Sequence, residues 1–182
     1  MKDWKEVNGW LFTEEAELLQ KYTKLTTFDI IELGVYEGKS SCAIYPVKNT
    51  TSHHYAIDTF DGRATTDMRD TFQEFKKNIE NSNIIIFKGT TDDFIKQYNG
   101  NIGLLFIDAD HSYNAVKNDF NNYFLNVLIN GFIIFHDAYG ENGEEEKTPW
   151  PGVTQFCKEL LLDDRVQFVE KCRRCAVFKR VK

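Results

Sequence analysis

The chain has 182 residues, 42% of them hydrophobic and 27% charged, which suits one globular domain with a sizeable core. Its formal net charge of −6 disfavours nucleic acid and anionic membrane surfaces as partners, because both require a basic protein surface. No apolar stretch approaches the roughly 20 residues of a membrane span, and residues 1–10 lack the apolar core of a signal peptide. We therefore expect a cytoplasmic protein with no nucleic-acid or membrane partner and with reduced cysteines.

Helical and strand patterns alternate along the chain. Apolar residues at helical spacing predict helices over residues 13–22, 38–45, 66–79, 91–98, 112–125 and 153–162. Runs that are apolar throughout predict strands over residues 28–34, 54–60, 83–89, 102–110 and 131–138, with a turn at Asn130–Gly131 before the last of them. Residues 165–171 and 175–181 predict a closing β-hairpin, with the CxxC of Cys172 and Cys175 at its turn.

Strands that are apolar throughout, each followed by a helix, indicate a parallel sheet that is covered on both faces. We predict an α/β fold with a doubly wound, mostly parallel, seven-stranded Rossmann-like sheet and a C-terminal antiparallel hairpin. Residues 1–182 are expected to form a single domain, in which residues 1–27 are an N-terminal helical cap segment. Ligands of such sheets bind beyond the carboxyl ends of the strands, so the residues at those ends are the candidates for function.

The turn after the first predicted strand runs from Glu32 to Ser40 and reads ELGVYEGKS. Its glycines, Gly34 and Gly38, follow a GxxxG spacing, which is neither the GxGxxG of a dinucleotide-binding turn nor the GxxxxGK[ST] of a P-loop. Glu37 inside the turn would also repel phosphate. Together with Glu32 it favours a cofactor that carries positive charge and no phosphate, such as S-adenosylmethionine. The alternative is a tight turn that needs glycine only for its backbone.

Acidic residues also stand at later strand ends. Asp58 ends the second strand, at a position where an acid takes ribose hydroxyls in several nucleotide-binding folds, although it can equally be a helix N-cap. Asp108 and Asp137 follow the fourth and fifth strands, each close to a histidine, His111 or His136. Two carboxylates and two imidazoles are difficult to explain by packing alone. They resemble a site for a divalent cation, Mg²⁺ or Mn²⁺.

These motifs, in this order, resemble class I S-adenosylmethionine-dependent methyltransferases. The stretch ELGVYEGKSS is similar to their first motif, acidic-x-Gly-x-x-x-Gly. Asp108 and Asp137 resemble the metal acids of the metal-dependent O-methyltransferases, which include the catechol and caffeoyl-CoA enzymes. The chain looks closer to the group with macrolide-sugar and cephamycin-pathway methyltransferases (methyltransferase domain family 24). The resemblance covers nearly the whole chain, but His136 stands where those relatives carry an acid.

The resemblance implies a set of site residues. It implies that Asp108, His136 and Asp137 bind the metal, and that His111, three residues after Asp108, is the catalytic histidine, acting together with Asp108. In methyltransferases the turn after the third strand approaches the adenine ring. The cofactor-binding residues expected on this basis are Glu32, Gly34, Tyr36, Glu37, Gly38, Ser40, Asp58, Gly89, Thr90 and Asp108.

We therefore predict an S-adenosylmethionine-dependent O-methyltransferase, assisted by Mg²⁺ or Mn²⁺, that acts on a hydroxyl of a sugar or another small molecule. Partner subunits of a homo-oligomer are expected to complete its acceptor pocket, because the chain is compact for this family. The loop at residues 139–151, with Trp150, is either a lid over the site or a solvated surface. Two other hypotheses stay open: a nucleotide- or metal-dependent α/β hydrolase, suggested by the GKS of residues 38–40, and a non-catalytic S-adenosylmethionine-binding module.

Overall fold

A seven-stranded sheet organises residues 1–62 and 69–182, which the computed structural model describes. The strands are β1 (Asp29–Leu33), β2 (His54–Asp58), β3 (Ile85–Lys88), β4 (Ile102–Ile107), β5 (Val127–Phe135), β6 (Val166–Cys172) and β7 (Cys175–Arg180). They lie in the order β3-β2-β1-β4-β5-β7-β6. All neighbours are parallel except that β7 runs antiparallel to both β5 and β6. This confirms the predicted doubly wound sheet with its antiparallel hairpin.

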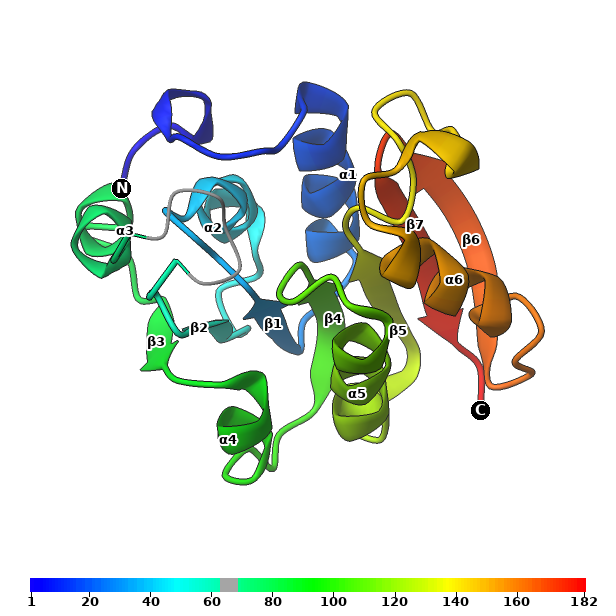
Figure 1. Cartoon of the computed structure of the whole chain (residues 1–182). Helices are drawn as coiled ribbons and strands as arrows, with labels where there is room; N and C mark the ends of the chain where they lie inside the picture. The colour runs from blue at the N-terminus through cyan, green and yellow to red at the C-terminus, as the bar shows by residue number, and fades with distance from the viewer. Residues whose placement is uncertain (63–68) are drawn as a thin grey trace.

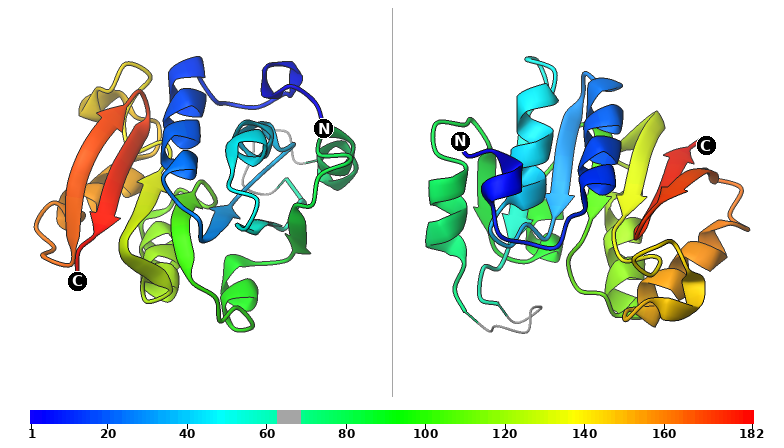
Figure 2. Two further views of the ribbon diagram at one scale, coloured as in Figure 1. Left: turned by 180° about the vertical axis from the view of Figure 1, so that it is seen from behind. Right: turned by 90° about the horizontal axis from the view of Figure 1, so that it is seen from above.

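Helices cover both faces of the sheet (Figure 1). One face carries α1 (Thr13–Lys24), α2 (Lys39–Ile44) and α3 (Phe72–Asn78), and the other carries α4 (Thr91–Ile95), α5 (Tyr113–Phe124) and α6 (Pro151–Leu160) (Figure 2). Short 3-10 turns occur at Trp4–Glu6, Tyr45–Val47 and Glu145–Lys147. None of the described helices is long and apolar enough to cross a membrane.

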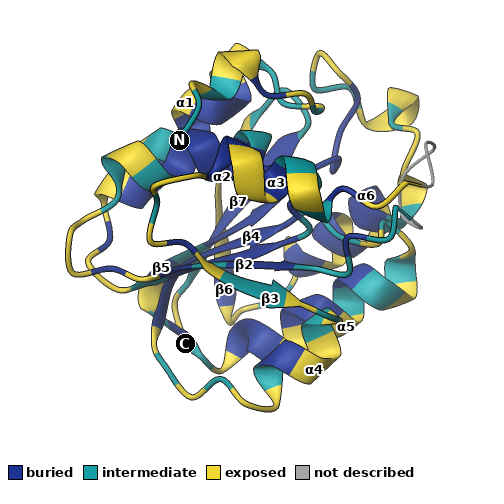
Figure 3. Cartoon of the chain, turned by 90° about the vertical axis from the view of Figure 1, so that its left-hand side faces the viewer, coloured by how far each residue is buried: buried dark blue, intermediate teal, exposed yellow. Residues whose placement is uncertain are grey.

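The central strands are buried because their side chains are apolar on both faces. Every residue of β4 is buried, and Figure 3 shows the central strands in dark blue between helices whose outer surfaces are exposed. On the face of the sheet that carries α5 and α6, the rings of Phe120, Phe135 and Phe156 pack against one another with centroids 5.3–6.2 Å apart. Burying rings of this size stabilises the fold by roughly 1.5–3 kcal/mol each.

The fifth strand differs from the prediction at its start. It begins at Val127, so Asn130–Gly131 lies inside β5 and not in a turn before it. Ile102 pairs with Val127 and Leu104 with Phe132, which leaves an irregular stretch of β5 between the two pairs. Asn130 adopts the left-handed conformation there (φ 70°), which asparagine tolerates better than most residues. The asparagine–glycine pair therefore forms a bulge, and the predicted turn is wrong.

The helix boundaries also shift. Of the predicted helix over residues 66–79, residues 66–68 lie outside the described residues, and α3 begins at Phe72. The first helix begins at Thr13 as predicted. The Glu15 carboxylate accepts a hydrogen bond from the Phe12 N–H at this helix end (2.9 Å), which satisfies one of the donors that every helix start leaves unpaired.

A buried polar cluster joins β1, β2 and α2. Oε2 of Glu32 accepts a hydrogen bond from the Ser41 hydroxyl (2.6 Å) and lies 2.7 Å from Nε2 of His54. The side chains of Glu32 and His54 are fully buried. Because an unpaired buried carboxylate is costly, this cluster holds the end of β1 in one position against α2.

Gly34 marks a close approach between β1 and β4. It has φ +82°, and a Cβ atom there would overlap the backbone carbonyl oxygen of Asp108. We predict that Gly34→Ala lowers the free energy of unfolding by on the order of 4 kcal/mol or more, measured by urea unfolding. Gly143→Ala is the matched control, because Gly143 also has φ +82° but its nearest neighbouring atom would be 3.7 Å away. The control should lose only about 1–2 kcal/mol, the cost of the left-handed backbone. Equal losses in the two variants would contradict the proposed overlap.

The carboxyl group of Asp119 on α5 is buried, which disfavours its charged form. Burial raises its pKa to about 6 from the ordinary 3.8, although the Thr91 hydroxyl donates to it (2.6 Å). The folded protein therefore holds this proton more tightly than the unfolded chain, and stability falls as the pH rises from about 4 to about 6. Since one unit of pKa corresponds to 1.36 kcal/mol, the loss is about 3 kcal/mol.

We predict that Asp119→Asn abolishes this decline and makes the protein more stable than the parent at pH 7. The amide oxygen can still accept the Thr91 hydroxyl. Urea unfolding at pH 4, 5, 6 and 7 measures the effect. Glu17→Gln, which removes an exposed acid of α1, should keep the parental pH dependence. A parental slope in Asp119→Asn would show that another group causes it.

Candidate functional site

Parallel pairing sets the carboxyl ends of the central strands side by side. The N–H of Asp108 donates to the carbonyl of Leu33 (2.8 Å), which joins the end of β4 to the end of β1. The N–H of His136 donates to the carbonyl of Ile107 (3.1 Å), which joins the end of β5 to that of β4. The side chains that follow these strands therefore meet at one edge of the sheet.

The glycine-containing turn after β1 is held by Asp58 at the end of β2. Oδ2 of Asp58 accepts hydrogen bonds from the N–H groups of Val35 and Tyr36 (2.8 and 2.9 Å), and Oδ1 accepts from that of Phe60 (2.7 Å). Tyr36 has φ 48° and Gly38 has φ 88°, so the turn is tightly wound. Asp58 is partly exposed and shapes this turn directly, while its predicted contact with ribose hydroxyls stays a prediction.

The two glutamates of the turn are both engaged within the protein. The side chain of Glu32 is fully buried and contacts Ser41 and His54. In this structure it therefore stabilises the turn from the interior of the protein. Glu37 is 6% exposed and pairs with the guanidinium of Arg69. Both glutamates thus have partners within the protein, and their predicted contact with a positively charged cofactor stays a prediction.

The N-terminal segment lies against the same turn. The Trp10 ring packs on the Tyr36 ring with centroids 5.1 Å apart, and the Tyr36 hydroxyl accepts a hydrogen bond from Arg69 (2.9 Å). Trp10 remains 56% exposed, so its outer face is open to solvent. Ser40 is buried in the first turn of α2.

The turn after β3 sits beside Asp58. The N–H of Gly89 donates to the backbone carbonyl of Asp58 (2.9 Å), so the two strand ends are neighbours. Thr90 is the N-cap of α4 and accepts a hydrogen bond from the N–H of Asp93 (3.1 Å). Thr90 therefore caps this helix, and the adenine contact of Gly89 and Thr90 remains a prediction.

Two carboxylates and two imidazoles converge beyond β4 and β5. Nδ1 of His136 lies 3.2 Å from both Asp108 Oδ1 and Asp137 Oδ2. Nε2 of His111 lies 3.5 and 3.1 Å from the same two oxygens. Neither nitrogen has the geometry of a hydrogen bond with any described residue, although both are buried. The structure therefore brings together all four residues that the sequence placed at these strand ends.

Neighbouring side chains enclose this cluster. Asp137 adopts a left-handed backbone (φ 57°), an uncommon conformation for a non-glycine residue that directs its carboxylate toward the histidines. Nη1 of Arg174, from the turn between β6 and β7, lies 3.4 Å from Asp137 Oδ1. The Trp150 ring stacks on His111 with centroids 4.5 Å apart and 19° between the planes. One tryptophan of the loop at residues 139–151 thus covers the cluster on the His111 side.

The mutual attraction of these groups outweighs the effect of burial on their pKa values. Burial alone would raise the pKa of Asp108 and Asp137, but His136 and His111 hold both pKa values below the ordinary range. Burial alone would lower the pKa of His111, but the two carboxylates raise it to about 9, and the pKa of His136 is raised as well. The four side chains are therefore linked by ion pairs of imperfect geometry.

The donor set fits a divalent cation. Asp108, His111 and Asp137 each offer one ligand atom, and these three atoms lie within 4.8 Å of one another. His136 Nδ1 faces the same oxygens. Two buried nitrogens without hydrogen bonds, beside two carboxylate oxygens, are the groups that a metal ion would satisfy. Carboxylates suit Mg²⁺, and the imidazoles shift the preference toward Mn²⁺.

Two of the residues that shape this cluster are not predicted from the sequence. Glu15 contacts His136 from α1, and Arg174 contacts Asp137 from the C-terminal hairpin. Glu15 lies in a helix and Arg174 in the turn of a hairpin, and no spacing in the sequence links residues 121 and 37 positions away from their partners. Asp110, two residues after Asp108, accepts the N–H of Ser112 (2.8 Å), and Ser112 is the N-cap of α5.

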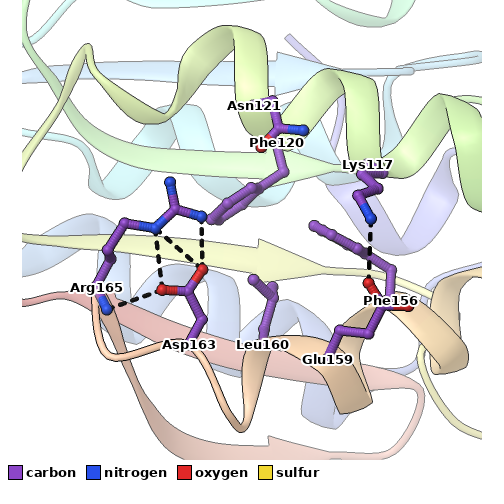
Figure 4. Close-up of a pocket in the computed structure, with 8 residues that line it drawn as sticks. All are labelled: Lys117, Phe120, Asn121, Phe156, Glu159, Leu160, Asp163 and Arg165. Carbon is purple, nitrogen blue, oxygen red and sulfur yellow. Dashed lines mark hydrogen bonds and ion pairs between the residues drawn. The ribbon is translucent and has the colours of Figure 1, made fainter.

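A separate hollow lies between α5 and α6, away from the cluster (Figure 4). It measures about 150 Å³ and contains two ion pairs, Lys117 with Glu159 and Asp163 with Arg165. None of the strand-end residues lines it. Its charged groups are already paired with one another, so the cluster at the strand ends remains the candidate site.

Comparison with known proteins identifies the family of the chain. A family model described as a methyltransferase domain matches residues 31–138, which include the turn after β1 and all four cluster residues. An uncharacterized protein of Acanthamoeba polyphaga mimivirus is 30% identical over 120 residues, which cover 59% of this chain and 50% of that protein. The chain thus spans about half the length of this curated relative.

Solved structures share the fold at low sequence identity. An O-methyltransferase from Bacillus cereus in complex with SAH has a TM-score of 0.71 and 17% identity, covering 95% of this chain and 83% of its own. The O-methyltransferase NovP has a TM-score of 0.73 and 14% identity, covering 93% and 80%. An SAH-bound methyltransferase from Podospora anserina has a TM-score of 0.67 and 15% identity, covering 92% and 78%. Because the family model spans more than half of the chain, the chain belongs to this methyltransferase-domain family, within the class I S-adenosylmethionine-dependent methyltransferases.

Proposed function

We propose that the protein is a divalent-metal-assisted O-methyltransferase that acts on a hydroxyl of a sugar or another small molecule. The observation that carries this proposal is the convergence of His111 Nε2 and His136 Nδ1 on the carboxylates of Asp108 and Asp137. S-Adenosylmethionine would supply the methyl group. A divalent cation held by Asp108, His136 and Asp137 would orient the acceptor hydroxyl and make it more acidic.

The side chains in and beside the cluster are proposed to have different roles in the reaction. Asp108 is the most exposed member, with 27% of its side chain open, so it faces the side from which an acceptor arrives. His111 is 15% exposed and can accept the hydroxyl proton at Nε2 once the carboxylate charges are compensated. Trp150 lies flat on His111 and restricts the ring to one orientation. Alignment of the acceptor oxygen with the methyl group then accounts for much of the rate.

The acceptor is proposed to be small and not a nucleic acid. The chain is acidic overall, and the loop beside the cluster contains Glu141, Glu144, Glu145 and Glu146. Such a surface repels phosphate backbones. The Trp150 ring, 37% exposed beside His111, offers an apolar surface on which a sugar or aromatic ring can stack. A homo-oligomer that completes the acceptor pocket is part of this proposal.

The first test concerns the cofactor and the cluster acids together. We predict that the protein binds S-adenosylmethionine by calorimetry, and that it binds Mn²⁺ in a chelator-treated sample. Asp137→Asn should weaken Mn²⁺ binding at least 100-fold, because it removes one anionic ligand, and should leave cofactor binding within about threefold. Asp163→Asn, which removes an acid of the α5–α6 hollow, is the control and should change neither. Absence of S-adenosylmethionine binding at millimolar concentration would refute the cofactor, and equal Mn²⁺ binding by Asp137→Asn would refute the metal site.

The second test asks whether His111 moves a proton or binds the metal. We predict that His111→Gln lowers kcat about 10²–10⁴-fold with an acceptor identified by screening hydroxylated small molecules, because general base catalysis contributes that range. Its Mn²⁺ affinity should stay within about threefold of the parent. His53→Gln, which alters an exposed histidine outside the cluster, should leave both quantities unchanged. A loss of Mn²⁺ affinity as large as that of Asp137→Asn would instead make His111 a metal ligand.

A further inference from the structure

Glu15, in the first turn of α1, is a charged residue with no exposed surface. Its Oε2 accepts the N–H of Phe12 (2.9 Å) and its Oε1 accepts the N–H of Arg174 (2.9 Å). A glutamate that only capped a helix would need the first of these contacts and could stay in solvent. The second contact ties α1 to the turn between β6 and β7, at the point where Arg174 also reaches Asp137.

The third contact of Glu15 is with the candidate metal site. Its Oε2 lies 3.3 Å from Nε2 of His136, and both side chains are almost completely buried. Because a carboxylate accepts and cannot donate, a hydrogen bond at this contact requires a proton on Nε2 of His136. The opposite nitrogen, Nδ1, then points toward Asp108 and Asp137, 3.2 Å from an oxygen of each.

We propose that Glu15 is a positioning residue that orients His136 and selects its tautomer, so that Nδ1 presents a lone pair to a divalent cation. A carboxylate that accepts the far N–H of a metal-binding histidine also increases the basicity of the ligand. This inference rests on the proposed function. It adds that the site depends on a residue from the N-terminal helix, which lies outside the region matched by the family model, residues 31–138.

A different role for Glu15 is disfavoured by its surroundings. Glu15, His136 and Cys175 also form a group whose ligand atoms lie within 4.8 Å of one another. Each oxygen of Glu15 already accepts a backbone N–H, and Oε2 also faces Nε2 of His136. Burial raises the pKa of the Cys175 thiol well above its ordinary value, which opposes the thiolate that a metal requires. The group is therefore a support for His136 and not a second metal centre.

The experiment compares two neighbouring acids of the same helix turn. Glu15→Ala removes the partner of His136, whereas Glu14→Ala removes an exposed acid that pairs with Arg173 and does not touch the cluster. Mn²⁺ affinity is measured by calorimetry on chelator-treated protein, and the visible absorption of the Co²⁺-loaded protein reports the ligand geometry. We expect Glu15→Ala to bind Mn²⁺ about 10–100-fold more weakly and to change the Co²⁺ bands. Glu14→Ala should match the parent in both measurements.

Thermal unfolding separates positioning from a merely structural role, because loss of the helix cap lowers the melting temperature without altering the Co²⁺ spectrum. If Glu15→Ala does not fold, Glu15→Gln replaces it, since an amide has one acceptor oxygen where the carboxylate has two. A variant at position 15 that retains the parental Mn²⁺ affinity and Co²⁺ bands would overturn the positioning role and leave the metal site standing. A parent protein that binds neither ion would overturn the proposed metal dependence and this inference with it. Calorimetry with S-adenosylmethionine on the same samples tests the cofactor part of the proposed function separately.

Discussion

The close parallel pairing of β1 with β4 and of β4 with β5 is the constraint on which the candidate site depends. Leu33, Ile107 and Phe135 pair in register across the three strands. The residues that follow them, among them Asp108 and His136, therefore become neighbours at the edge of the sheet. This pairing is possible at its tightest point because Gly34 has no Cβ to meet the carbonyl of Asp108. The glycine therefore serves both the turn that follows β1 and the placement of the acid that follows β4.

The electrostatics of the site follow from that placement. Gathering Asp108 and Asp137 in a largely buried position would be unfavourable without compensating positive charge. His111 and His136 supply it, and the same attraction raises the pKa values of both histidines. Their contacts with the carboxylates are short enough for ion pairs but are not aligned for hydrogen bonds. In the Glu32–His54–Ser41 group, by comparison, one carboxylate oxygen lies 2.6–2.7 Å from two partners, while the other oxygen of Glu32 and Nδ1 of His54 also lack hydrogen bonds with described residues.

Segments far along the chain from the ends of β4 and β5 complete the site. Glu15 comes from the first helix, Arg174 from the last hairpin and Trp150 from the loop before α6, and each contacts one member of the cluster. The sheet order explains why they can meet, because β7 inserts beside β5 and brings its turn next to the end of that strand. The acids and histidines of the β4 and β5 ends provide the chemistry, and these three residues determine how rigidly it is held.

The sequence alone determined the fold class, because apolar runs ending in glycine or an acid, each followed by a helical pattern, are compatible with few arrangements other than a doubly wound parallel sheet. It also identified Asp108, His111, His136 and Asp137, since polar residues directly after buried strands must meet at one edge. It misjudged Asn130–Gly131, because a bulge within a strand and a turn before a strand have the same local signature. Only the tertiary structure decided that Glu32 and Glu37 are engaged by His54, Ser41 and Arg69, and that Glu15 faces His136. Those contacts join residues between 9 and 121 positions apart, and their existence depends on the packing of helices against the sheet, which local residue patterns do not encode.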